Sequence, residues 1–276
     1  MSTEAVKQKL LMVANLGVYF DFPPEQIQAY TREVVSFLKN HKDTVDNIEY
    51  FNLLELQFWL DIFTSRDVDA KIVLDRISDQ FALVGSLLRL KILQLAYYEA
   101  QGDVERAKEV LGDDANQLRL QRRLTTFQRQ NPEAYITALN RYLDTCGLDL
   151  MAWSELATQY TNTGHYDMAA YSYQEILLQE PLAYPFWFRA GTSYYQQYLQ
   201  QQKSLKPQPA IELLDLALKH FARSVELCHV YDNGWKGIQL LVDLGVPAKL
   251  KSAPGSDAYA KQLAKLKPLI PTSTTN

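Results

Sequence analysis

The chain has 276 residues, of which 47% are hydrophobic and 22% are charged. This composition excludes an intrinsically disordered protein, because such chains lack the apolar residues for a packed core. The formal net charge of −4 argues against a general nucleic-acid-binding protein, which typically has a basic face. Two cysteines, Cys146 and Cys228, are too few for a disulfide framework, so we expect a reducing, cytosolic compartment.

Residues 1–44 are predicted to form one or two helices ahead of the main body of the protein. The sequence FPPEQI at 22–27 places proline in the first turn of a helix, where its missing N–H is harmless. Because Glu4 precedes the N-terminal lysines and Asn15 interrupts the apolar run, we favour an ordinary first helix over a signal peptide. No segment reaches the roughly 18 uninterrupted apolar residues that a membrane-spanning helix requires.

Weakly patterned helical hairpins are predicted between residues 45 and 149. LDIFTSRDVDAKIVL (60–74) and YEAQGDVERAKEVL (98–111) each combine a turn with small and apolar residues at helical spacing. A degenerate hairpin follows, whose first helix is expected to pack Leu120, Leu124 and Phe127 inward.

A stronger period lies between residues 150 and 245. Trp153 and Trp187 are 34 residues apart, which is the period of a tetratricopeptide helix hairpin. Trp187 and Trp235 are 48 residues apart, an excess of 14. The same excess separates two other spacings, because Tyr160 to Ala169 is 9 residues whereas Tyr194 to Ala217 is 23. The two counts agree on one register, with an insertion near 195–209.

The residue types at these positions suit contacts between helices. Small residues let paired helices approach closely, aromatic residues fill the space between turns, and proline ends a helix. The predicted packing residues are Trp153, Leu156, Tyr160, Gly164, Ala169, Tyr173, Pro181, Trp187, Gly191, Tyr194, Ala217, Phe221 and Trp235. We therefore predict an all-α fold, a tetratricopeptide-repeat solenoid over residues 45–245 in which helix-turn-helix pairs form a right-handed superhelix. Residues 246–276 are predicted to be a tail with a short amphipathic helix.

A solenoid of this kind leaves a concave groove lined by the first helix of each pair. The groove positions are predicted to be Ser154, Glu155, Thr158, Phe188, Arg189, Thr192, Tyr195, Lys236 and Leu240. Phe188, Tyr195 and Leu240 are too apolar for a purely solvated surface, which favours a partner-binding strip. The alternative is that a terminal segment of the chain folds back over the strip.

Two charged segments offer further surfaces. A basic helix is predicted to carry Arg119, Arg122, Arg123 and Arg129, and could bind an acidic partner or phospholipid headgroups. The alternative is a solvated face paired with the nearby Asp113 and Asp114. In the tail, Tyr259, Leu263 and Leu266 could cap the end of the solenoid. The alternative there is contact with a membrane surface through Lys261, Lys265 and Lys267.

No catalytic constellation is evident in the sequence. The four histidines have no pair at the i, i+4 spacing of a zinc site, and neither a Cys-x-x-Cys pair nor a phosphate-binding glycine loop occurs. We therefore expect a protein that is not an enzyme and that needs no metal or cofactor.

Four segments carry a more specific resemblance. VLGDDANQLRLQRRL, ALNRYLDTCGLDLMAWSELATQY, GHYDMAAYSYQEILLQEPLAYPFWFRAGTSYY and HFARSVELCHVYDNGWKGI follow one another in the chain. In this order they resemble the family of subunit 2 of the endoplasmic reticulum membrane protein complex, over about residues 50 to 245.

The resemblance implies a non-catalytic scaffold, peripheral at the cytosolic face of the endoplasmic reticulum membrane. Such a subunit holds cytosolic segments of the complex's membrane subunits and a soluble neighbouring subunit, and touches the membrane only through the complex. The assembled complex inserts tail-anchored and multipass proteins into the bilayer. The alternative is a free tetratricopeptide adaptor or co-chaperone that delivers clients.

Overall fold

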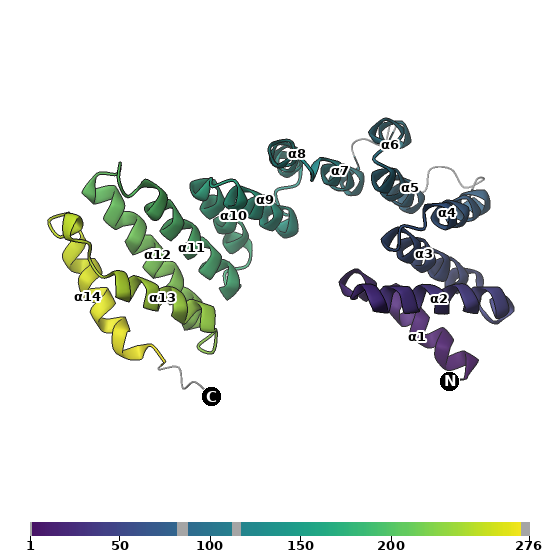
Figure 1. The fold of residues 1–276 in the computed structure, drawn as a ribbon, viewed down its shortest axis with the longest axis horizontal. Helices are drawn as coiled ribbons and strands as arrows, with labels where there is room; N and C mark the ends of the chain where they lie inside the picture. Colours follow the sequence, from purple (N-terminus) through teal and green to yellow (C-terminus); the bar gives the residue numbers. More distant parts are fainter. Residues whose placement is uncertain (1, 82–87, 112–116, 272–276) are drawn as a thin grey trace. The chain divides into compact units, whose positions relative to one another are not determined.

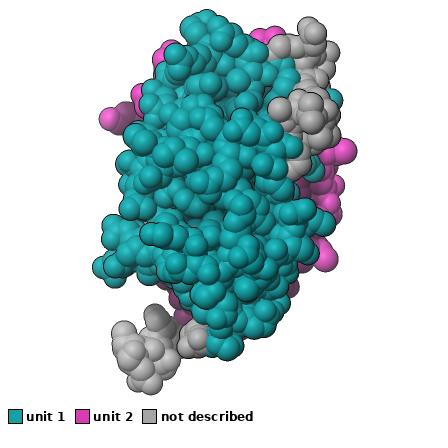
Figure 2. Space-filling model, turned by 90° about the vertical axis from the view of Figure 1, so that its right-hand side faces the viewer, with its two compact units in different colours: residues 1–127 teal, residues 128–276 magenta. Residues whose placement is uncertain are grey.

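The computed structural model describes residues 2–81, 88–111 and 117–271. Within these ranges the regular elements are all helices (Figure 1). The chain divides into two compact units, Met1–Phe127 and Gln128–Asn276, which Figure 2 draws in teal and magenta. The all-α fold class predicted from the sequence is confirmed. No helix in the described ranges is both long enough and apolar enough to cross a bilayer.

Unit 1 consists of helices that pack against their neighbours in chain order. They are α1 (Thr3–Leu16), α2 (Pro24–Asn40), α3 (Asn47–Phe63), α4 (Asp67–Phe81), α5 (Leu88–Gln101), α6 (Val104–Leu111) and α7 (Leu118–Thr125), with the short 3-10 helices η1 (Val18–Asp21) and η2 (Lys42–Thr44). Buried leucine and aromatic side chains from α1 to α5 form one core that includes Leu10, Leu53 and Phe58. A second core joins α5, α6 and α7 through Leu95, Ala107, Leu111 and Leu120.

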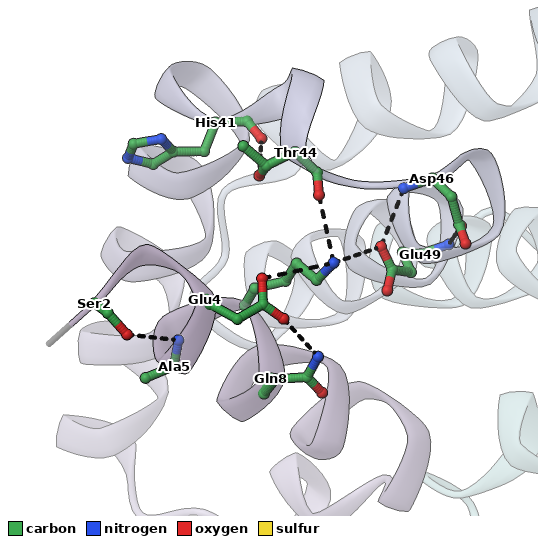
Figure 3. A network of polar contacts seen from close by, with 9 residues as sticks. Ser2, Glu4, Ala5, Gln8, His41, Thr44, Asp46 and Glu49 are labelled. Atoms are coloured by element: carbon green, nitrogen blue, oxygen red, sulfur yellow. Dashed lines mark hydrogen bonds and ion pairs between the residues drawn. The ribbon is translucent and has the colours of Figure 1, made fainter.

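The start of α3 is fixed by a capping box. The Asp46 carboxylate accepts a hydrogen bond of 2.7 Å from the Glu49 N–H, and the Glu49 carboxylate accepts one of 3.0 Å from the Asp46 N–H. The ammonium of Lys7, the unlabelled side chain at the centre of Figure 3, bonds to Glu49 at 3.1 Å and to the Thr44 carbonyl at 3.4 Å. The hydrogen bond to Glu49 raises the pKa of Lys7. This network ties α1 to the beginning of α3.

Unit 2 contains the strongly periodic part of the sequence. Its helices are α8 (Pro132–Thr145), α9 (Leu150–Asn162), α10 (Tyr166–Gln179), α11 (Tyr184–Gln201), α12 (Pro207–Leu227), α13 (Asp232–Leu244) and α14 (Ser256–Leu266). Helices α11 and α12 have 18 and 21 residues, whereas α9 and α10 have 13 and 14. The additional residues of the interrupted hairpin therefore lengthen both of its helices, and Pro207 begins the second one.

Hydrogen bonds repeat with the spacing of the tryptophans. The indole N–H groups of Trp153, Trp187 and Trp235 each donate to the carbonyl six residues earlier, at Gly147, Pro181 and His229, over 2.9, 2.9 and 2.7 Å. Asn140 donates to the Tyr160 hydroxyl at 3.0 Å, and Gln174 donates to the Tyr194 hydroxyl at 2.6 Å. Because both sets of bonds repeat after 34 residues, the tetratricopeptide register of these hairpins is confirmed.

The predicted amphipathic helix of the tail corresponds to α14. It packs against α12 and α13, and buries Tyr259 and Leu263 in the core formed by the end of unit 2. Burial raises the pKa of Tyr259 well above its ordinary value. Lys261, Lys265 and Lys267 are exposed. This packing favours the interpretation of the tail as a cap.

Candidate functional site

The first predicted groove positions, on α9, are engaged in a polar cluster within unit 2. Glu155 is half-buried and accepts a hydrogen bond from the Tyr135 hydroxyl, while the Arg129 guanidinium lies 3.7 Å from its other oxygen. Burial, and then the hydrogen bond to Glu155, raises the pKa of Tyr135. Thr158 is exposed, and its hydroxyl donates to the Ser154 carbonyl at 2.8 Å.

On α11 the apolar groove positions contribute to the core. The Phe188 ring lies 5.6 Å from the Phe221 ring and 5.8 Å from the Tyr231 ring, measured between centroids. Tyr195 is half-buried in the same core. Packing within unit 2 therefore accounts for the apolar character of these two residues without a partner.

The neighbouring positions on α11 and α13 remain accessible. Arg189 is exposed, with its guanidinium 5.8 Å from the Phe186 ring centroid, whereas Thr192 is half-buried and donates to the Phe188 carbonyl. Lys236 is exposed and pairs with Asp232 at 3.6 Å. Leu240 is also exposed. The accessible groove residues, called the exposed strip below, are thus Thr158, Arg189, Lys236 and Leu240.

The four arginines predicted to share one basic helix have separate roles in the structure. Arg123 pairs with Glu99 and lies 5.7 Å from the Trp59 ring, so its charge serves unit 1 internally. Arg122 donates to the Thr125 hydroxyl at 3.0 Å, and Arg119 is exposed. Arg129 belongs to unit 2. Asp113 and Asp114, the predicted partners, lie outside the described residues.

A cavity of about 670 Å³ in unit 1 was not expected from the sequence. It opens between α1 and α3, where Asn52 donates to the Asn15 amide oxygen at 3.5 Å and the Arg89 guanidinium donates to Asn52 at 3.0 Å. Its lining combines amide and aliphatic side chains: Gln8, Lys9, Leu11, Met12, Asn15, Glu49 and Asn52. Such a lining suits the main chain and apolar side chains of a peptide. The available signal was Met12 and Leu16, exposed at i, i+4 opposite the buried face of α1.

Groups that could bind a metal were also sought. Over the described ranges, histidine, cysteine, aspartate and glutamate side chains nowhere gather in threes in a way that could hold a metal ion. The two cysteines are unpaired thiols at the ends of α8 and α12.

Comparisons with known proteins identify relatives of the chain, although no protein-family model matches it. It is 26% identical over 257 residues to ER membrane protein complex subunit 2 of Saccharomyces cerevisiae, which covers 87% of this chain and 86% of the relative. It is 27% identical over 232 residues to TPR repeat protein oca3 of Schizosaccharomyces pombe, covering 79% and 74%. The Xenopus tropicalis ER membrane protein complex subunit 2 is 30% identical over 166 residues, covering 59% of this chain and 52% of that protein.

A solved structure supports the fold. The C-terminal part of a TPR repeat-containing protein from Cytophaga hutchinsonii matches with a TM-score of 0.54 and 12% identity, covering 94% of this chain and 95% of that chain. At this identity the likeness concerns the fold alone. The chain is therefore a homologue of ER membrane protein complex subunit 2 and has a tetratricopeptide-repeat fold.

Proposed function

We propose that this protein is a non-catalytic scaffold subunit of the ER membrane protein complex. The observation that carries the proposal is the similarity to the yeast subunit, which extends through 87% of this chain and 86% of the relative. In this role it holds cytosolic segments of the membrane subunits and a soluble neighbouring subunit. The free adaptor is the competing interpretation.

The hairpins of unit 2 supply the physical basis for holding other chains. Their large side chains pack against one another, as Trp153, Trp187 and Trp235 do through equivalent hydrogen bonds, so the register of the helices is fixed. Successive first helices then present the exposed strip, with two cations and an aliphatic side chain. A preformed surface of this kind binds without a large cost in ordering its own backbone.

The proposed location is the cytosolic face of the endoplasmic reticulum membrane, with attachment through the other subunits. Insertion of tail-anchored and multipass proteins belongs to the assembled complex. This chain contributes by organising the subunits that carry out the insertion.

Gently solubilised membranes are expected to yield the protein in a fixed ratio with several integral-membrane partners. The physical reason is that a scaffold buried in several interfaces dissociates slowly. The measurement is affinity purification of the full chain followed by quantitative mass spectrometry. Recovery only as a free cytosolic monomer would instead support the adaptor.

Reversing both charges of the exposed strip, with Arg189→Glu and Lys236→Glu, is expected to lower the recovery of those partners about tenfold or more. Two like charges facing a partner's acidic groups cost several kcal/mol at an interface. Phe188→Ala is a poor test, because it also removes core contacts with Phe221 and Tyr231.

The matched control carries the same charge change away from the strip. Lys203 and Lys265 are both exposed, and Lys203→Glu with Lys265→Glu should leave partner recovery unchanged. Circular dichroism checks that both double variants keep their helical content. Normal partner binding by the Arg189 and Lys236 variant would remove the strip from the interface and leave the scaffold role to other surfaces.

A further inference from the structure

Three turns that join successive hairpins of unit 2 have the same backbone structure. They are residues 146–149 between α8 and α9, 180–183 between α10 and α11, and 228–231 between α12 and α13. In each turn the N–H of the fourth residue donates to the carbonyl of the first, over 3.4, 3.1 and 3.0 Å. The carbonyl of the second residue accepts the tryptophan indole. Each turn is therefore held from two sides.

The third residue of every one of these turns is an exposed aliphatic. Leu148, Leu182 and Val230 have 79%, 71% and 87% of their surface accessible, so they add nothing to the core. Met151 and Leu178, at 68% and 75%, lie next to them in sequence. Single exposed apolar side chains are ordinary on protein surfaces. Their repetition at one equivalent position in three turns indicates a surface with a use.

Contacts between the turns make this surface continuous. The Gln179 side chain, beside the second turn, donates to the Gly147 carbonyl of the first turn at 3.2 Å. The ring of Tyr184, which follows the second turn, lies 4.9 Å from the ring of Tyr231 in the third turn. We call the row of Leu148, Met151, Leu178, Leu182 and Val230 the turn ridge.

The charge around the turn ridge has one sign. The segments 144–151, 178–185 and 226–233 contain no lysine or arginine and five acidic residues: Asp144, Asp149, Glu180, Glu226 and Asp232. Arg223 and Lys236, just outside these segments, pair with Glu226 at 3.1 Å and Asp232 at 3.6 Å. Asp144 and Glu180 are exposed beside the aliphatic side chains. An apolar row with an acidic border complements a partner that is apolar and basic.

We propose that the turn ridge is a second docking surface, and that its occupant is a basic amphipathic segment of a partner protein. The aliphatic side chains bury the apolar face of that segment, and its lysine and arginine side chains pair with Asp144 and Glu180. A membrane surface fits less well, because the cytosolic leaflet is itself anionic. The turn ridge shares no residue with the exposed strip, so it gives the scaffold a separate contact. The proposal rests on the proposed function only in requiring a protein partner.

Site-specific cross-linking tests the occupant directly. A benzophenone amino acid is placed at Met151 of the full chain in the cell that produces it, and at Ile72, an exposed aliphatic position of unit 1, as the control. Irradiation is expected to join Met151 to a peptide in which aliphatic residues are flanked by lysine or arginine, with no such product from Ile72. Cross-links to lipid, to a second copy of this chain or to an acidic segment, and the absence of any cross-link, would each overturn the proposal.

Variants assign the cross-link to the ridge. With the probe at Met151, the triple change Leu148→Ser, Leu182→Ser and Val230→Ser is expected to lower the cross-linked yield at least about tenfold. So is the charge reversal Asp144→Lys with Glu180→Lys. The matched triple change Ile48→Ser, Val68→Ser and Ile72→Ser, at similarly exposed aliphatic residues of unit 1, should leave the yield unchanged. An equal yield from all variants would overturn the assignment.

The outcome separates this inference from the proposed function. Loss of the Met151 cross-link while membrane partners still co-purify removes the turn ridge alone. Absence of membrane partners removes the proposed scaffold role, whereas a Met151 cross-link to a basic segment would still support the ridge.

Discussion

Gly237→Ala is expected to lower the free energy of unfolding of the protein by about 1–3 kcal/mol, because it overpacks a filled core. A Cβ at Gly237 would lie 2.7 Å from a carbon of the Phe221 ring, and a Cβ at Gly191 would lie 2.8 Å from the same ring. The ring therefore lies between α11 and α13, against backbone that leaves no room on either side. In an exposed helix the same change stabilises by about 1 kcal/mol, so the sign of the result is informative.

Urea unfolding followed by circular dichroism measures the effect, with the m-value checking that the cooperativity is unchanged. The control is Gly237→Ala in a Phe221→Leu background, where the smaller side chain makes room for the methyl group. There the change should be neutral or stabilising. A stabilising effect of Gly237→Ala in the natural sequence would mean that Phe221 moves aside easily and that close packing is not what requires glycine at this position.

This packing was largely predictable from the sequence, because it depends on local periodicity. Trp153, Trp187 and Trp235 mark equivalent positions, and the spacing between them already placed Phe221 in line with Tyr173 of the preceding hairpin. Helical hairpins that bury one face against their neighbours repeat the same side-chain shapes at a fixed period. The repeated indole hydrogen bonds follow from that register.

The surface of Phe188 and Tyr195 could not be predicted in the same way. Helical periodicity assigns a face to each residue, but it does not say which distant segment covers that face. Phe188 is covered by Phe221 and Tyr231, and Tyr195 packs in a core that also contains Tyr259 of α14, more than 60 residues later. The same limit applies to Arg123, whose partners Glu99 and Trp59 are remote in sequence.

The turn ridge was visible in the sequence only after the turns had been aligned. Leu148, Leu182 and Val230 occupy the same place in three repeats, yet an aliphatic residue close to helix ends reads equally well as core. The exposed fractions decide between these interpretations, because packing against neighbours is a property of the assembled hairpins. Accessibility, rather than the periodicity, was the missing information.

Asp61→Asn is expected to raise the free energy of unfolding at pH 8 by about 2–3 kcal/mol and to change it little at pH 4. The Asp61 carboxyl lies in α3 with none of its surface accessible. Gln57 donates to one of its oxygens at 3.3 Å, and the Arg66 guanidinium is 3.7 Å from the other. Burial outweighs these contacts and raises the pKa of Asp61 to about 6.

The direction follows from proton linkage. The ordinary aspartate pKa is about 3.9, so between about pH 4 and pH 6 the folded protein binds this proton more tightly than the unfolded chain does. Stability therefore falls as the pH rises through this window and stays reduced above it, because the folded state then holds a buried carboxylate. An asparagine at position 61 carries no charge, and removes that cost only where the natural residue would be ionised.

The measurement is urea unfolding of both proteins at several values between pH 4 and pH 8. Asp75→Asn serves as the control, because Asp75 is exposed and pairs with Lys71 on the surface of α4, where ion pairs contribute little. Its effect should be small at every pH. If Asp61→Asn instead destabilises the protein at pH 8, the attraction between the carboxylate and Arg66 exceeds the cost of burial, and Asp61 is a buried ion-pair partner that the fold requires in its charged form.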